Sequence, residues 1–192
     1  MRRTLALAVA GGCLLALTAS GAAAANVVKN GSLEDLNGRF TATHCGYMAV
    51  HARSHAIAKW TVPPATTGEL AWGTNTCDGY TAAKGAFFVD LTGFGADSVN
   101  GAIRQTLRTR PGRHYQFSID VCTCNDGSLS VRIGKKQLVL SPGQPFVVGS
   151  TSWTPMTARF KGGRKARPAL TIMNATPGAQ IIVIDDVVIG RP

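Results

Sequence analysis

Short runs in which apolar and polar residues alternate recur along most of the chain. The clearest is residues 113–123, RHYQFSIDVCT, where every second residue from Tyr115 to Val121 is apolar. The residues between them are polar, up to Cys122. Because successive side chains of a β-strand point to opposite faces, this run predicts a strand with one buried and one outward face.

Similar runs predict further strands, separated by Gly, Pro, Asn and Asp. The expected strands are 57–62, 86–91, 101–109, 128–134, 136–140, 146–148, 153–160, 168–173 and 181–190. Turn compositions occur at 110–112 and 141–145, and no stretch holds a helical period. Many short strands with turn signals between them are typical of an all-β sandwich or jelly roll. The stretch 39–56 has no clear period and three histidines, which predicts a long loop.

The first 25 residues have the composition of an export signal. Arg2 and Arg3 precede an apolar run, which ends in small residues up to Ala25. This is the pattern of a secretory signal peptide at 1–25, cleaved after Ala25. Residues 26–192 then have the size of one domain. No other stretch approaches the roughly 20 apolar residues of a membrane helix, so the sequence predicts a secreted, extracellular protein without a membrane span.

The charge of the chain favours acidic partners. The formal net charge is +10, and removal of Arg2 and Arg3 lowers it to +8. Basic proteins bind acidic polymers, and outside a cell these are anionic polysaccharides, teichoic-type polymers or membrane surfaces before nucleic acid. A charge that only keeps the protein soluble is the alternative.

Four cysteines remain after export, which fits an oxidising compartment. They are Cys45, Cys77, Cys122 and Cys124, and two disulfides among them have three possible connectivities. Cys45–Cys77 with Cys122–Cys124 is slightly favoured, but Cys122 and Cys124 share a strand face and could each pair outward. Zinc binding with His44 is conceivable, although the spacing lacks the Cys-x-x-Cys form of structural zinc sites.

The sequence holds few signs of catalysis. It contains neither a Gly-x-Ser-x-Gly nor a His-Glu-x-x-His motif. A glycosidase needs two carboxyl groups that face each other, and the chain has 10 acidic residues in all. We therefore expect a protein that is not an enzyme.

Two adjacent carboxylates interrupt the last apolar strand. Asp185 and Asp186 lie within IIVIDDVVIG, so one of them points inward. A buried carboxylate is costly unless it is paired or bound to a metal, and residues 179–190 contain no Lys or Arg. Calcium accepts carboxylate and carbonyl oxygens, so this pair is a candidate ligand set. Alternatively, one Asp accepts backbone N–H groups at a bulge while the other is solvated.

An ordered set of short motifs extends over almost all of 26–190. The motifs are NVVKNGSLE, KWTV, GAFFVDLTG, GAIRQTLRTRPGRHYQFSIDV, WTPMTARFKG and IDDVVI. Together they resemble the galactose-binding-like β-sandwich domains of carbohydrate-binding modules. The likeness is closest to a secreted domain-of-unknown-function family of plant cell walls and its bacterial choice-of-anchor relatives. The chain departs from that pattern at Leu33, where Phe is usual, at Cys-x-Cys 122–124 and in the loop 44–55.

The resemblance implies a jelly-roll sandwich, polysaccharide binding and no catalysis. Related modules often hold a structural calcium ion between the N-terminal turn and the last strand. On this chain, that implies Ca²⁺ ligands from the Asn30 region, Glu34 and Asp185 or Asp186, while Asp35 is expected at the surface.

Sugar binding needs aromatic platforms and polar groups. Trp60 and Trp153 occupy motif positions that pack inside such sandwiches, whereas Trp72, Tyr80 and Tyr47 are the candidate platforms.

Outward polar positions of two consecutive strands are a candidate floor for a sugar groove. These positions are Arg104, Arg108, His114, Gln116, Ser118 and Asp120. Arginines bind carboxylates in a bidentate way, so they favour an anionic sugar such as a uronate. Alternatively, the row is only the solvated face of an antiparallel sheet. The expected function is a secreted carbohydrate-binding or cell-wall-associated module, and the alternative is a cell-surface structural or protein-interaction factor.

Overall fold

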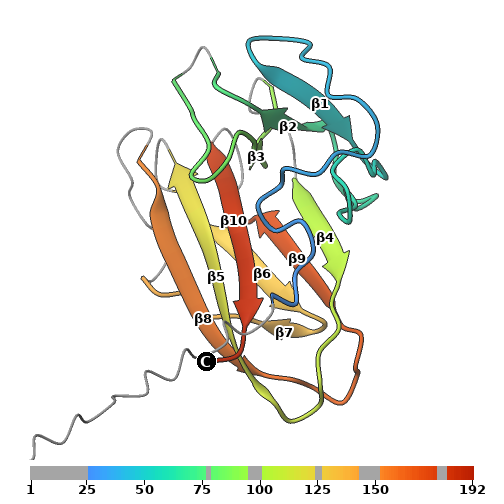
Figure 1. Ribbon diagram of the computed structural model, residues 1–192, viewed down its shortest axis with the longest axis vertical. Coiled ribbons are helices and arrows are strands. Elements are labelled where there is room, and N and C mark those ends of the chain that lie inside the picture. Colours follow the sequence, from blue (N-terminus) through green and yellow to red (C-terminus); the bar gives the residue numbers. More distant parts are fainter. Residues whose placement is uncertain (1–25, 77–78, 95–100, 124–126, 143–151, 177–180) are drawn as a thin grey trace, which may run out of the picture.

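Two antiparallel sheets pack face to face in the computed structural model, which describes residues 26–192 except 77–78, 95–100, 124–126, 143–151 and 177–180. The six-stranded sheet contains, in spatial order, β1 (Tyr47–His51), β2 (Glu69–Gly73), β3 (Phe88–Asp90), β10 (Ile182–Gly190), β5 (His114–Thr123) and β8 (Thr154–Lys161) (Figure 1). The four-stranded sheet contains β4 (Ala102–Thr106), β9 (Ala169–Asn174), β6 (Leu129–Ile133) and β7 (Lys136–Gln137). The predicted all-β sandwich is confirmed. In the described part of the chain, no helix is long and apolar enough to cross a membrane.

The clearest sequence pattern forms the longest strand. In β5, Tyr115, Phe117, Ile119 and Val121 are all buried, while His114 and Gln116 are exposed. β5 pairs with β10 on one side and with β8 on the other. The period-2 pattern therefore predicted both the strand and the face that enters the core.

Three predictions about the other strands were wrong or fall outside the described residues. Residues 57–62 form only the isolated bridges Leu36↔Ile57 and Thr61↔Arg104. The expected loop 39–56 contains β1, which pairs with β2. The sequences of β1 and β2 do not alternate cleanly between apolar and polar residues. The pairing of these two strands with each other, rather than a local pattern, decides their structure. The expected strand 146–148 lies outside the described residues.

The apolar side chains form two clusters, one on each face of the six-stranded sheet. The main core lies between the sheets and includes Trp60, as predicted, together with Trp72 and Phe117. The second cluster contains Tyr47, Ala71, Tyr80, Phe88, Cys122 and Val183. Because Cys122 and Val183 alternate with main-core residues along β5 and β10, this cluster lies on the outer face. Trp153 is half-buried against it, so the prediction that Trp153 packs between the sheets was wrong.

The cysteines are only partly described. Cys45 is disulfide-bonded, and Cys122 is fully buried in the second cluster. Cys77 and Cys124 lie outside the described residues, so the connectivity stays a prediction.

The N-terminal segment joins the two sheets. Val27 N donates to Ile189 O (2.8 Å), and Val187 N donates to Gly31 O (2.8 Å), so the segment pairs with the half of β10 that β3 does not reach. In Figure 1, this blue segment passes between β10 and β4. A Cβ atom at Gly31 would lie 1.9 Å from Val187 O. Only glycine allows this close backbone approach.

We therefore expect Gly31→Ala to lower the free energy of unfolding by about 1–3 kcal/mol, because the added methyl group forces the segment away from β10. Gly163→Ala is the matched control, since a Cβ atom there meets no atom within 4 Å. It should change stability by less than about 0.5 kcal/mol in urea unfolding. Equal effects of the two substitutions would contradict this account.

Candidate functional site

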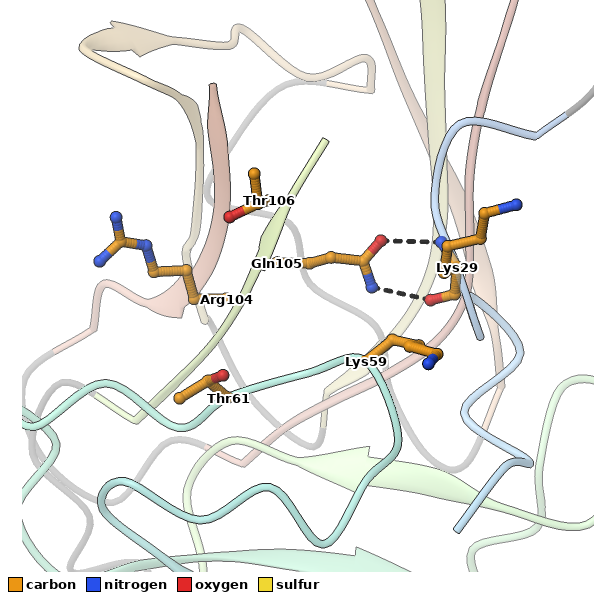
Figure 2. Close-up of a pocket in the computed structure, with 6 residues that line it drawn as sticks. All are labelled: Lys29, Lys59, Thr61, Arg104, Gln105 and Thr106. Atoms are coloured by element: carbon orange, nitrogen blue, oxygen red, sulfur yellow. Dashed lines mark hydrogen bonds between the residues drawn. The ribbon is translucent and has the colours of Figure 1, made fainter. Parts of the chain in front are cut away.

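A pocket of about 420 Å³ opens at the edge of β4. We call it the edge pocket. Its lining residues come from the N-terminal segment, the segment before Pro63 and β4, and they are Lys29, Lys59, Thr61, Arg104, Gln105 and Thr106 (Figure 2). Figure 2 shows Arg104 extending from one side of β4, while Gln105 extends from the other side toward Lys29. Cations therefore lie on both sides of this strand edge.

Backbone pairing brings the pocket residues together. Thr61 and Arg104 exchange two hydrogen bonds, each with an N–O distance of 2.9 Å, so the segment that carries Thr61 covers the edge of β4. Trp60 Nε1 donates to Asn30 O (2.8 Å), which fixes the same segment to the N-terminal turn. Lys59 has φ 71°, a left-handed conformation that is uncommon for a residue with a side chain. The hydrogen bonds of Trp60 and Thr61, which directly follow Lys59 in the chain, hold its backbone in this conformation.

Gln105 fixes the backbone of Lys29 from the neighbouring sheet. Lys29 N donates to Gln105 Oε1 and Gln105 Nε2 donates to Lys29 O, both at 2.7 Å (Figure 2). Gln105 is only 6% exposed, so its amide is a fixed structural contact. The lysine side chain remains exposed beside the pocket. Gln105 therefore positions Lys29.

The cations of the edge pocket have no carboxylate partner among the described residues. The two ion pairs among the described residues are His51–Glu69 (3.9 Å) and Lys84–Asp186, and both lie outside the lining of the edge pocket. Lys29, Lys59 and Arg104 belong to neither pair. Their charges are therefore open to an anionic ligand. Of the predicted sugar-binding residues, Arg104 alone lines this pocket.

The three predicted aromatic platforms are buried, which corrects that prediction. Trp72 is 0% exposed, Tyr80 4% and Tyr47 5%. Trp72 packs inside the sandwich against Phe40 and Phe87, with ring centroids 5.5 and 5.1 Å away. Tyr47 and Tyr80 belong to the second cluster. None of the three rings presents a face on which a sugar could stack.

The predicted polar floor is divided between the two sheets. Arg104 lies on β4 and Arg108 just beyond its end, on the four-stranded side, whereas Gln116 and Asp120 lie on β5 of the six-stranded sheet. The prediction assumed that consecutive strands pair, but β5 pairs with β10 and β8. These residues therefore do not form one continuous row.

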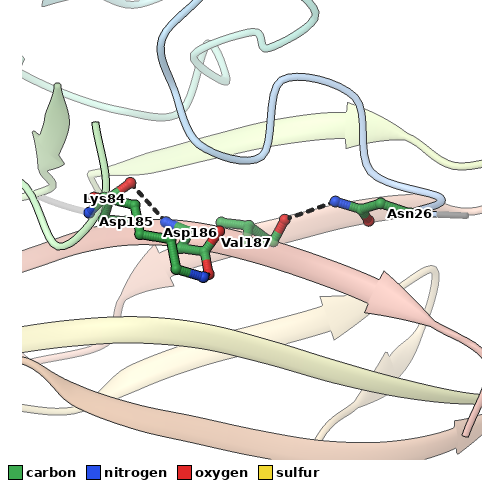
Figure 3. A network of polar contacts seen from close by, with 5 residues as sticks. All are labelled: Asn26, Lys84, Asp185, Asp186 and Val187. Atoms are coloured by element: carbon green, nitrogen blue, oxygen red, sulfur yellow. Dashed lines mark hydrogen bonds and ion pairs between the residues drawn. The ribbon is translucent and has the colours of Figure 1, made fainter. Parts of the chain in front are cut away.

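Asp185 is held by backbone donors at a bulge in β10. The register with β5 shifts between Asp185 and Val188. Asp185 Oδ2 accepts from Lys84 N (3.0 Å), and Oδ1 accepts from Asp186 N (2.6 Å). Asp186 has φ 44° and pairs with the Lys84 ammonium group. Figure 3 shows this network beside the contact of Asn26 with Val187 O. Residues 179–190 contain no Lys or Arg, and Lys84, which is distant in the sequence, supplies the cation that pairs with Asp186.

The predicted calcium ligands have separate structural roles. Glu34 Oε1 accepts from Ala86 N (3.0 Å) and Phe87 N (2.8 Å). The Asn30 side chain bonds backbone atoms of Asp35 and Ala58. Within the described ranges, no group of three His, Cys, Asp or Glu side chains could hold a metal ion. Asn and backbone carbonyl oxygens are not among these groups, so calcium stays a prediction from the sequence.

Burial changes the protonation of this network. It raises the pKa of Asp185 to about 7, against the lowering effect of backbone hydrogen bonds from Lys84, Asp186 and Ala83. Burial, followed by the charge of Asp186, also raises the pKa of Asp120. The hydrogen bond to Asp186 raises the pKa of Lys84. The network therefore responds to pH, although it lies apart from the edge pocket residues.

Comparison with solved structures supports the fold. TmCBM61, solved in complex with β-1,4-galactotriose, is 14% identical with a TM-score of 0.54, covering 88% of this chain and 99% of that chain. A putative sugar binding protein from Bacteroides thetaiotaomicron is 13% identical with a TM-score of 0.51, covering 88% and 100%. The match to the enzymatically active domain of bacteriophage CBA120 tailspike protein 4 has 15% identity and a TM-score of 0.49, and covers 86% of this chain but 21% of that chain.

The first two likenesses show a jelly-roll sandwich of the kind found in carbohydrate-binding modules, and at such identities they show the fold alone. No protein-family model and no curated protein matches the chain.

We expect the stability of the protein to fall as the pH rises from about 4 to about 7. The folded pKa of Asp185, about 7, lies above the ordinary value of about 3.9 in an unfolded chain. Between these values the folded protein keeps a proton that the unfolded chain has released, so raising the pH favours unfolding. Asp185→Asn cannot titrate and should reduce this slope in urea unfolding at several pH values.

Asp35→Asn is the control, because it removes a carboxylate from the exposed surface. It should keep the wild-type slope. A slope in Asp185→Asn equal to that of the wild type would rule out Asp185 as the group responsible.

Proposed function

We propose that this chain is a secreted carbohydrate-binding module that prefers acidic polysaccharide. The observation that carries the proposal is the edge pocket, where Lys29, Lys59 and Arg104 surround a strand edge without carboxylate partners among the described residues. The sandwich fold agrees with this function, because one solved structure of the same fold holds a galactotriose.

A saccharide chain that crosses the edge of β4 would meet different groups on the two sides. Arg104 offers a planar fork for a uronate carboxylate. Lys59 and Lys29 offer point charges on the other side, where Gln105 fixes the backbone of Lys29. The hydroxyl groups of Thr61 and Thr106 can bond sugar hydroxyls. Since none of the described lining residues is aromatic, charge rather than stacking would supply the affinity, and salt should weaken it.

The remaining parts of the proposal rest on the sequence. The signal peptide 1–25 lies outside the described residues and supports export by its composition alone. The absence of catalysis and the likeness to the plant cell-wall family are likewise predictions from the motifs. A protein-interaction role would favour a contiguous exposed apolar patch. The large apolar side chains exposed on the described surface are Leu36 and Val139, so sugar binding is the better supported function.

We expect Arg104→Gln and Lys59→Gln each to weaken binding to polygalacturonate by about fivefold to tenfold, because each removes a charged contact. Affinity electrophoresis at low and high salt measures this. Retention of the wild type should fall as the salt concentration rises.

Arg39→Gln is the matched control, because Arg39 is exposed and does not line the edge pocket. It should bind like the wild type. The proposal fails if neutral galactan is retained as strongly as polygalacturonate, or if the control loses as much binding as the pocket variants.

A further inference from the structure

A second pocket, of about 240 Å³, lies at the end of the sandwich where the β6–β7 turn meets the segment after β8. We call it the basic-end pocket. Its cationic lining residues are Lys135, Lys136, Lys161, Arg164 and Lys165. Its apolar lining residues are Ile133, Phe160 and Pro168, and Thr109 adds a hydroxyl group. The pocket therefore combines an apolar surface with a ring of positive charge.

Among the described residues, the charge of this pocket has no ion-pair partner. Residues 127–175, which supply every lining residue except Thr109, contain no Asp or Glu. The five cations take part in neither of the two ion pairs among the described residues. Lysine and arginine side chains gathered without counter-charges attract an anion.

Thr109 provides an independent sign of a ligand. Its side chain is only 4% exposed, and Oγ1 has no hydrogen-bond partner among the described residues. A buried hydroxyl group without a partner is costly. Because Thr109 lines the pocket, a polar group of a bound molecule could complete its hydrogen bonding.

The walls of the pocket are held in place. Phe160 stacks on Tyr115, with ring centroids 5.2 Å apart and an angle of 17° between the planes. Tyr115 Oη accepts from Arg110 N (2.8 Å). Gly162 exchanges backbone hydrogen bonds with Gly112 and Arg113, and a Cβ atom there would lie 2.3 Å from Arg110 O. The apolar surface is therefore rigid, whereas a Cβ atom at Gly163 would meet only open space.

We propose that the basic-end pocket is a second saccharide subsite, which binds one acidic sugar residue. The apolar surface suits the C–H face of a pyranose ring, the cations suit a carboxylate or sulfate, and the Thr109 hydroxyl suits a sugar hydroxyl. The proposal rests on the proposed function for the class of ligand, but it uses different residues. Its failure and that of the edge pocket can therefore be separated.

Calorimetric titration with three matched trisaccharides tests the subsite. The probes are a galacturonate trisaccharide, a sulfated galactotriose and neutral β-1,4-galactotriose. We expect one or both acidic probes to bind, and the neutral probe to bind at least about tenfold more weakly. The acidic probe that binds more tightly identifies carboxylate or sulfate as the preferred anion.

Two pocket variants separate charge from hydrogen bonding. Lys161→Gln with Arg164→Gln should weaken acidic binding by about tenfold or more. Thr109→Val keeps the shape of the side chain but removes the hydroxyl group, so it should weaken binding without lowering the unfolding temperature. A merely structural Thr109 would change stability and leave binding unchanged. Gly163→Phe should obstruct the pocket while the protein remains folded.

The double variant Arg39→Gln with Arg53→Gln is the charge-matched control, because both residues are exposed and line neither pocket. Binding lost in the basic-end variants but kept in Arg104→Gln supports this subsite and contradicts the edge pocket. Binding lost only in Arg104→Gln overturns this subsite alone. Equal competition by inorganic sulfate or by single-stranded oligothymidylate would also overturn it, because charge alone would then explain binding.

Discussion

The buried carboxylate of Asp185 determines how the outer face of the six-stranded sheet is built. Asp185 lies on β10, the strand between β3 and β5, and is 0% exposed. A carboxylate in such a place needs donors. The backbone of Lys84 supplies one, and its ammonium group pairs with Asp186. The segment around Lys84 is thereby fixed on β10, although it lies 101 residues away in the sequence.

This attachment has a consequence for ligand binding. The segment that carries Lys84 also carries Tyr80, which packs with Tyr47 and Phe88 in the second cluster. This part of the outer face is therefore covered by the protein's own side chains. Both described pockets with clustered cations instead involve the four-stranded sheet or the end of the sandwich. The acidic network and the basic pockets lie on different elements, so the described carboxylates of that network do not cancel the positive charge of the pockets.

Local patterns predicted part of this structure. The alternation of residues 113–123 predicted β5 and its buried face, because burial of one face imposes a period of two. The core position of Trp60 was predicted from the resemblance to galactose-binding-like domains, not from a local pattern. The pairing of strands could not be read in this way. Arg104 was correctly predicted to face outward. The prediction that it lies beside the polar residues of β5 was wrong, because β4 and β5 belong to different sheets.

The candidate sites were less predictable than the strands. The contacts between Lys84 and Asp186 and between Gln105 and Lys29 join residues 102 and 76 positions apart. No local pattern indicates such contacts. Trp72 illustrates the opposite error, since an aromatic residue in a sequence that resembled a loop became a central part of β2 and of the core. Its residue type suggested an exposed platform for a sugar ring, whereas the pairing of β2 with β1 and β3 buries the Trp72 side chain.

The geometry of β4 links the two pockets physically. Arg104 lines the edge pocket and Thr109 lines the basic-end pocket. Beyond β4 the chain stays paired, because Leu107 N donates to Pro168 O and Thr109 N to Ala166 O. Five residues of extended chain span about 17 Å. Individual exposed charges bind weakly, but the two proposed subsites, held on one strand, would raise the effective concentration of the second contact once the first has formed. An acidic polymer long enough to reach both pockets would therefore bind more tightly than its separate residues.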